Sequence, residues 1–174
     1  MKRYIKQSLQ IISLALLLCS PVFAKTTPDD EQQIHIKSDS FHFDNQNGIA
    51  TYTGHVLATQ GTRQLTGDRL EIYRDPKTGQ IDKLIAYGEP AKYQGLTAPD
   101  KPLLFAHAQT ITYWVATESL ILTGQAEITQ AGDVYRAAQI EYDGVKQTVY
   151  SPPSDQGQTF IILKNRTSKQ DAGI

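Results

Sequence analysis

The side chains best suited to metal binding or acid–base chemistry are four histidines, His35, His42, His55 and His107. No two of them have the spacing of an H-x-H or H-E-x-x-H metal site. The first three alternate with apolar neighbours, so they fall on the polar side of the segments that carry them. A jelly-roll metalloenzyme would need paired histidines within one strand, and "FHFD" supplies one. We therefore predict no metal and no cofactor.

Acidic residues and nucleophile motifs give no stronger indication of catalysis. Asp68 and Glu71, like Glu127 and Glu141, stand where outward-facing acids are ordinary. The stretch "GTRQLTGDR" has the glycines of a phosphate-binding loop but lacks its Lys-Ser/Thr pair, and no G-x-S-x-G occurs. We expect a protein that is not an enzyme. A secreted hydrolase or cupin-like enzyme is the alternative, and it would depend on residues such as His107 and Asp68.

The elements that must position any site are β-strands, because apolar and polar residues alternate along nearly every segment after residue 33. Examples are "IHIKS", "ATYTGHVLATQ", "DRLEIY" and "QTITYW". Turn-forming stretches such as "DNQNG", "DPKTGQ" and "SPPSDQG" separate them. The best helix candidate, "TPDDEQQ", is short and polar. The sequence therefore predicts an all-β chain of many short strands.

Two parts of the chain repeat each other at an offset of 70 residues. "YTGHVLATQG" (52–61) and "LTGQAEITQA" (122–131) share Thr, Gly, Thr and Gln at matched places, and "DRLEIY" lies over "AQIEYD". Gly54 and Gly124 stand inside the matched strands, where glycine usually marks a bulge or a bend. One such unit cannot bury its apolar face alone. We therefore expect two related halves that face each other around the interior.

The N-terminus has the pattern of a cleaved export signal. Lys2, Arg3 and Lys6 precede the apolar run "IISLALLLC", and cleavage is expected after Ala24. The apolar run is too short to span a bilayer comfortably. A retained membrane anchor and lipidation at Cys19 remain as alternatives.

We therefore expect a signal peptide (1–24), a flexible N-terminus (25–32), one β-domain (33–163) and a disordered tail (164–174). Cleavage would remove the single cysteine, so the mature chain could form no internal disulfide. It would also leave 14 Lys and Arg against 18 Asp and Glu, a net charge of −4. Because the basic residues are scattered, nucleic acid is not an expected partner.

Apolar rings are frequent on the predicted inward side of the strands. They fit either a plain sandwich core or a groove that holds acyl chains between its walls. Under the groove interpretation, the candidate lipid-binding residues are Ile34, Ile36, Phe41, Phe43, Tyr52, Val56, Tyr93, Phe105, Ile111, Tyr113, Leu122 and Ile128.

Several of these stretches together resemble a known family. "IHIKSDSFHFDNQNGIATYTGHVLATQG" is followed in order by "TGDRLEIY", "YGEPAKY", "AHAQTITY" and "LTGQAEITQ". Over residues 33–163 the chain is similar to the periplasmic lipopolysaccharide-transport protein A family (LptA, OstA-like). It has "GHV" and "GQA" where the family pattern has G-N-A/V. The resemblance implies a β-jelly roll of two facing antiparallel sheets, open at both ends.

The resemblance also implies a function. Such a protein is a soluble periplasmic bridge that carries lipopolysaccharide from the inner-membrane export complex to the outer-membrane assembly translocon. By motif position it assigns lipid contact to Ile34, Ile36, Tyr93 and Tyr113. It further implies head-to-tail association with itself and with both neighbours. The first strand ("QIHIKS") and the last ("TFIILK") are the natural edges for such pairing.

Two alternatives of other kinds stay open. One is a membrane-linked component of the same export complex, which would keep its N-terminal helix. The other is a structural periplasmic β-protein without cargo, which would have a filled core.

Overall fold

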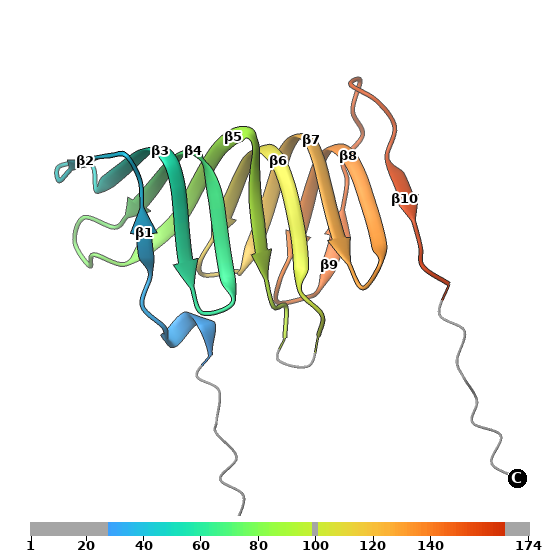
Figure 1. The fold of residues 1–174 in the computed structure, drawn as a ribbon, viewed down its shortest axis with the longest axis horizontal. Coiled ribbons are helices and arrows are strands. Elements are labelled where there is room, and N and C mark those ends of the chain that lie inside the picture. Colours follow the sequence, from blue (N-terminus) through green and yellow to red (C-terminus); the bar gives the residue numbers. More distant parts are fainter. Residues whose placement is uncertain (1–27, 99–100, 166–174) are drawn as a thin grey trace, which may run out of the picture.

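The computed structural model describes residues 28–98 and 101–165, and these form a single antiparallel sheet (Figure 1). Its elements are the 3-10 turn η1 (Asp29–Glu31) and strands β1 (His35–Lys37), β2 (Ser40–Asp44), β3 (Ile49–Gln60), β4 (Arg63–Arg74), β5 (Ile81–Gly95), β6 (Leu104–Trp114), β7 (Ser119–Gln130), β8 (Asp133–Asp143), β9 (Thr148–Tyr150) and β10 (Phe160–Ile162). The strand order is β1-β3-β4-β5-β6-β7-β8-β10, with β2 on β3 and β9 on β8. The predicted all-β class is confirmed.

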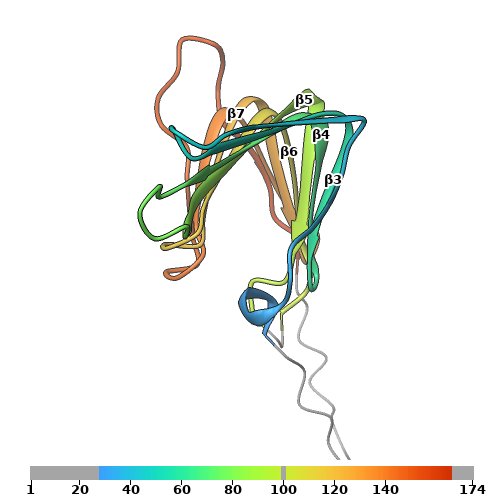
Figure 2. The same cartoon turned by 90° about the vertical axis from the view of Figure 1, so that its left-hand side faces the viewer.

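The long strands bend near their middles, so one sheet folds into two facing walls (Figure 2). Each bend coincides with a register shift, as between Thr53 and Val56 in β3 and between Thr123 and Ala126 in β7. We call wall 1 the half made of β2, β9 and segments 49–53, 69–74, 81–87, 110–114, 119–123 and 139–143. Wall 2 comprises β1, β10 and segments 56–60, 63–66, 91–95, 104–107, 126–130 and 133–137. The predicted facing antiparallel layers are confirmed, and both layers belong to one folded sheet.

The repeated glycines stand at two of these bends, as the sequence predicts. Gly54 and Gly124 have φ of +83° and +80°, a conformation that L side chains rarely adopt. A side chain at either position would also collide with Asp39 or Gln109, respectively. At each bend the glycine and its successor oppose a single residue of the neighbouring strand, which is the arrangement of a β-bulge.

The two halves do not face each other, so that expectation is wrong. The first half contributes β3 and β4 and the second contributes β7 and β8, and these strands follow one another along the sheet. The reason is that each long strand crosses the bend and supplies a segment to both walls. The halves are therefore neighbours along the groove, each completing the next by backbone hydrogen bonds.

The core between the walls consists of small and aliphatic residues with two tyrosines. Its most deeply buried large side chains are Leu70, Ile72, Leu104, Ile111, Leu120, Leu122, Ile128 and Ile140. Burying each such side chain stabilises the fold by about 1.5–3 kcal/mol. Within residues 28–98 and 101–165 no polar or charged residue is buried.

The helix candidate "TPDDEQQ" forms only the 3-10 turn η1. Over the described ranges, no helix has both the length and the apolar character that crossing a membrane requires. The predicted signal peptide and residues 166–174 of the predicted tail lie outside the described residues.

Candidate functional site

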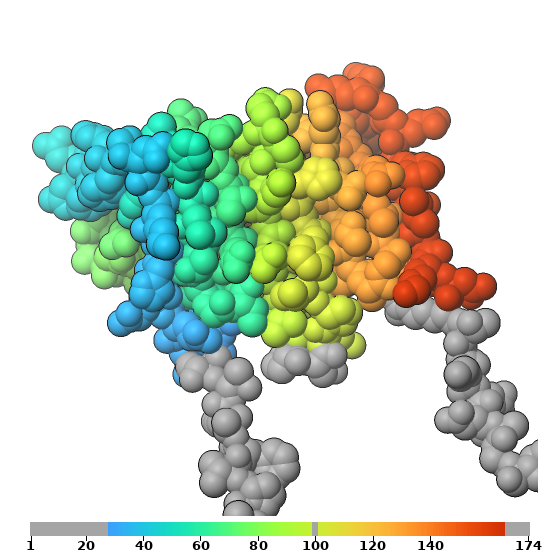
Figure 3. All heavy atoms as spheres, in the orientation of Figure 1, coloured from blue at the N-terminus to red at the C-terminus, as the bar shows by residue number. Residues whose placement is uncertain are grey.

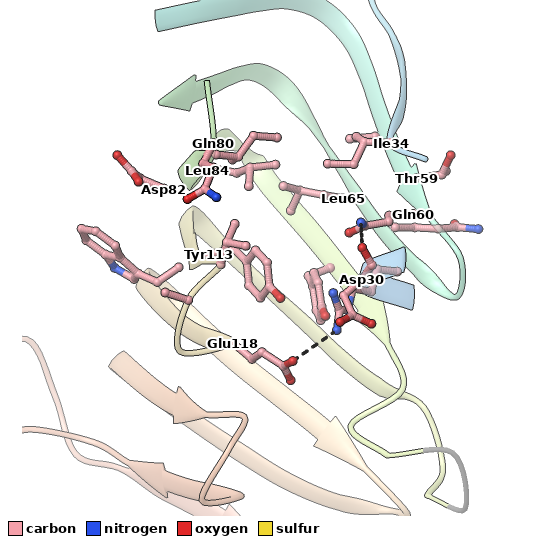
Figure 4. A pocket seen from close by; sticks show the side chains of 18 residues that line it. Asp30, Ile34, Thr59, Gln60, Leu65, Gln80, Asp82, Leu84, Tyr113 and Glu118 are labelled. Carbon is pink, nitrogen blue, oxygen red and sulfur yellow. Dashed lines mark hydrogen bonds and ion pairs between the residues drawn. The ribbon is translucent and has the colours of Figure 1, made fainter. Parts of the chain in front are cut away.

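A cavity of about 760 Å³ lies between the two walls toward the β1 end of the sheet (Figure 4). Wall 2 supplies Ala58, Leu65 and Tyr93 to it, and wall 1 supplies Leu84 and Tyr113. The volume is within the range of about 300–1,000 Å³ that is typical of ligand sites. The interior at this end is therefore a hollow and not a packed core.

The apolar lining follows from the alternation of the strands. In β4, the side chains of Arg63 and Leu65 face the interior while Gln64 between them is exposed. In β5, Leu84 is buried between the less buried Lys83 and Ile85. Because neighbouring strands keep this phase through their register, the inward residues of several strands form one apolar surface.

Two tyrosines narrow the interior at the inner end of this cavity. The rings of Tyr93, on wall 2, and Tyr113, on wall 1, stack with centroids 6.3 Å apart and planes at 21°. Burial is the main cause that raises the pKa of both hydroxyls, so both side chains are neutral at physiological pH. The rings therefore act as uncharged, largely apolar contact surface.

Charged groups lie at the rims of the two walls opposite the bends. We call the slit between these rims the mouth, with Arg63 and Asp29 on the side of wall 2 and Glu118 on the side of wall 1. Arg63 Nη2 is 3.9 Å from Glu118 Oε1, and Arg63 Nε is 3.8 Å from Asp29 Oδ2. The guanidinium also lies 5.8 Å from the centroid of the Tyr113 ring, within the range of a cation–π contact. Polar contacts at this place are thus confined to the rim of an apolar interior.

The turn η1 is held against the mouth by hydrogen bonds. The carboxylate of Asp29 accepts hydrogen bonds from Thr62 N at 2.8 Å and from Thr62 Oγ1 at 2.5 Å. Gln60 Nε2 donates to the backbone oxygen of Gln32 at 3.1 Å. These contacts fix the N-terminal part of the described chain beside the rim of wall 2.

Most of the predicted lipid-binding residues lie on the inner side of the walls. Val56, Ile111, Tyr113, Leu122 and Ile128 are buried, Ile36, Tyr52 and Tyr93 are partly buried against the core, and Ile34, Tyr93 and Tyr113 line the main cavity. The structure thus brings together the residues that the alternation assigns to the interior.

Phe41 and Phe43 are placed differently, with 60% and 43% of their surface exposed. They pair with Tyr52 and Ala50, so they share the inner face of wall 1. Their strand, β2, is at the edge of the sheet. These two rings therefore flank the open β1 end of the groove and not its closed interior.

The prediction that Phe105 lines the interior is wrong. Phe105 lies between the buried residues Leu104 and Ala106 in β6, and it is 48% exposed on the outer face of wall 2. Its neighbours on that face include the polar residues Gln94 and Thr129, with which it pairs. Strand alternation assigns Leu104 and Ala106 to the interior instead.

Sequence reasoning missed Leu65, Leu84, Arg63 and Glu118 as groove residues. The two leucines stand on the apolar phase of predicted strands, so the alternation could have identified them. Nothing in the sequence pairs Arg63 with Glu118, because the fold brings together the start of β4 and the turn between β6 and β7.

None of the four histidines lines the main cavity. His55 is 92% exposed and its Nδ1 lies 2.7 Å from Asp39 Oδ2, a contact that raises the pKa of His55. His35 and His42 are also exposed, as predicted from their phase. Among the described residues no group of three or more His, Cys, Asp or Glu side chains is arranged to hold a metal ion.

Comparison with known proteins gives a consistent family match. Residues 35–148 match the family model described as "LptA/(LptD N-terminal domain) LPS transport protein". The lipopolysaccharide export system protein LptH of Pseudomonas aeruginosa is 34% identical over 147 residues, which cover 84% of this chain and 83% of the relative. The lipopolysaccharide export system protein LptA of Escherichia coli K12 is 32% identical over 168 residues, covering 95% and 89%.

A solved structure shares the fold. The crystal structure of LptH from Pseudomonas aeruginosa, described as the LptA-homologous periplasmic component of the lipopolysaccharide transport device, superposes with a TM-score of 0.71 at 30% identity. The match covers 79% of this chain and 99% of that chain.

Proposed function

Because this chain belongs to the LptA/LptD N-terminal-domain family of lipopolysaccharide transport proteins, we propose that it is a periplasmic bridge protein for lipopolysaccharide. In this proposal it passes lipopolysaccharide from the inner-membrane export complex toward the outer-membrane translocon, with the acyl chains held between the walls. The observation that carries the proposal is the hollow, apolar interior in a chain whose relatives are named for lipopolysaccharide export.

The physical reason lies in the cost of exposing acyl chains to water. Each methylene group moved into an apolar environment contributes about 0.8 kcal/mol, so a lipid with several chains needs shelter along its path. Aliphatic and ring surfaces such as Leu65, Leu84 and Tyr113 hold such chains without fixed direction. This lining lets cargo slide, whereas a set of directional hydrogen bonds would hold it in one place.

The ends of the sheet support association in a row. β1 and β2 lie at one end of the molecule and β10 at the opposite end (Figure 3). Edge strands carry backbone groups that another strand can pair with. The exposed side chains of Phe160, Ile161 and Ile162 add apolar surface at the β10 end. Pairing unlike ends repeats without closing, which gives a row that reaches both partner complexes.

A structural role without cargo is less well supported. It calls for a filled interior, whereas about 760 Å³ lies open between the walls. The family itself is described as a transport family, so we propose no catalytic activity.

Photocrosslinking tests the proposal. A photoreactive amino acid at Tyr113 or at Leu84 should form adducts with lipopolysaccharide in cells, because both positions face the cavity. The same amino acid at Phe105, on the outer face of wall 2, is the matched control and should form few. Equal adduct yields at the inner and outer positions, or none at the inner ones, would refute lipid transport through the groove.

A further inference from the structure

The interior is not one continuous passage in this structure. The main cavity ends at Tyr93 and Tyr113, beyond which a space of only about 20 Å³ remains. A second cavity of about 260 Å³ opens farther along, where Leu104, Ile128 and Tyr142 contribute to its lining. Cargo that travels the length of the groove must therefore widen this narrow place.

The narrow place is bordered by an ion pair that joins the two walls. Arg63 begins β4 on the rim of wall 2, and Glu118 lies in the turn between β6 and β7 on the rim of wall 1. Their contact crosses the mouth directly beside the stacked tyrosines, since both residues also line the 20 Å³ space. Separating the rims requires separating these two charges.

Arg63 also neutralises two acids that would otherwise repel. Asp29 is beside wall 2 and Glu118 is on wall 1, and the guanidinium lies between them at 3.8 and 3.9 Å. Without Arg63, two carboxylates of like charge would face each other across the mouth. The rim is acidic beyond this pair, because Asp30 and Asp82 also line the cavity. That surplus of acids disfavours a different role for Arg63, the direct binding of an anionic group.

We propose that Arg63 acts as a positioning residue for cargo passage: with Asp29 and Glu118 it forms a clasp that holds the rims together and keeps Tyr93 and Tyr113 closed on each other. This inference rests on the proposed function. Opening the clasp joins the main cavity to the smaller one, so a lipid with several chains can advance. A ligand with one chain fits the main cavity while the clasp is closed.

The geometry of the clasp suits repeated opening. Both ion-pair distances exceed the 2.7–3.2 Å range of an N–H···O hydrogen bond. The contacts are therefore electrostatic attractions without the directional requirement of a hydrogen bond. The side chain of Glu118 is 47% exposed, which leaves the wall 1 partner accessible to water and salt. Arg63, at 17% exposure, stays seated over the Tyr113 ring.

The width of the mouth can be measured directly. Spin labels on Gln64→Cys and Ala116→Cys, in a chain with Cys19→Ser, report the distance between the rims by pulsed electron paramagnetic resonance. We expect one short distance at low salt, and a longer or broader distribution in Arg63→Gln, in Glu118→Gln and at high salt. Arg63→Lys should keep the short distance, because it keeps the charge.

A matched control lies on the same strand. Arg69 pairs with Glu71 at 3.5 Å within wall 1, so Arg69→Gln removes an equal charge without touching the mouth. It should leave the distance distribution unchanged. A distribution in Arg63→Gln and Glu118→Gln that equals the wild type would overturn the clasp, as would an equal change in Arg69→Gln.

Ligand binding separates the clasp from the proposed function. Purified lipid A should enter Arg63→Gln about two- to fivefold more readily than wild type, the size of effect that a partly exposed ion pair supports. A single-chain alkyl maltoside should bind both proteins equally. If lipid A binds but does not discriminate between them, the clasp is wrong. If lipid A binds neither, lipid transport is wrong, and the distance measurements still decide the clasp.

Discussion

Tyr93 and Tyr113 meet across the groove although their strands are hydrogen-bonded neighbours. β5 pairs with β6, yet Tyr93 is opposite Ala106 and Tyr113 is opposite Leu84, so the two rings belong to different walls. Their centroids are 6.3 Å apart because the sheet folds between them. This contact is where the two walls approach each other in the interior, and it divides the groove into two cavities.

Removing one of the rings should cost stability. Tyr113→Ala deletes a side chain that is 91% buried, and we expect a loss of about 3 kcal/mol in the free energy of unfolding, the low end for large aromatic truncations because the site already borders a cavity. Urea denaturation measures the change. Tyr150→Ala, at a tyrosine that is 56% exposed, should change it little. Equal losses of unfolding free energy in the two variants would show that the contact between Tyr93 and Tyr113 does not stabilise the fold.

A charge at the cavity wall should weaken lipid binding. Ile34 lines the main cavity and is half-buried, so Ile34→Asp should reduce the affinity for lipid A by about tenfold, which corresponds to 1.4 kcal/mol of lost apolar contact. Fluorescence or calorimetric titration gives the affinity. The neighbouring exposed residue gives the control, since His35→Asp adds the same charge outside the cavity. Similar affinities for the two variants would remove Ile34 from the binding site.

The bulge glycines should tolerate no side chain. Gly124→Ala forces an alanine to φ near +80° and against Gln109, so we expect a loss of more than the ~1–2 kcal/mol that a left-handed conformation alone costs. Gly79→Ala is the matched control, with φ of +74° and open space around the added carbon. Thermal or urea unfolding compares them. A smaller loss at Gly124 than at Gly79 would contradict the argument.

The surface pair His55–Asp39 should be visible in a pH titration. The hydrogen bond that the His55 ring donates to the Asp39 carboxylate raises the pKa of His55 above its ordinary value of 6.5, and Asp39→Asn should lower it again. Since the folded-state pKa is the higher one, the pair's stabilisation is fully present below pH 6.5 and is lost as the pH rises through the raised value. Nuclear magnetic resonance of the His55 ring measures the pKa. An unchanged His55 pKa in Asp39→Asn would refute this assignment.

The row model predicts a specific effect at the last strand. Ile161 is 50% exposed in β10 at the edge of wall 2, so Ile161→Lys should reduce self-association at a given protein concentration. Sedimentation velocity gives the distribution of species. Phe105→Lys places the same charge on the outer face of β6, in the middle of the sheet, at a residue that is 48% exposed, and should leave association unchanged. Loss of association in both variants would point to net charge and not to the edge.

Much of the fold could be predicted because alternation and glycine placement are local signals. The phase of Tyr52, Val56 and Leu122 correctly assigns an inner face, and Gly54 and Gly124 mark real bulges. The direction in which the halves associate is not a local property. A repeat offset shows that two units are alike, but facing walls and consecutive strands produce the same offset.

The site was harder to predict than the fold. Phe105 was misplaced because a large apolar ring suggests burial, whereas its phase in β6 between Leu104 and Ala106 puts it outside. Arg63 and Glu118 could not be paired in advance, since their contact depends on how sharply the sheet folds. Charged residues beside turns carry no periodic signal that would reveal a partner on the opposite wall.

The aligned bulges have a consequence for how such a groove can grow. Since every long strand bends at the same level, the length of the strands sets the cross-section of the groove and the number of strands sets its extent. Duplication of a unit within one chain and docking of a second molecule at an edge strand are then geometrically equivalent ways of lengthening the groove. The length of the groove can therefore change by either route while its cross-section stays constant.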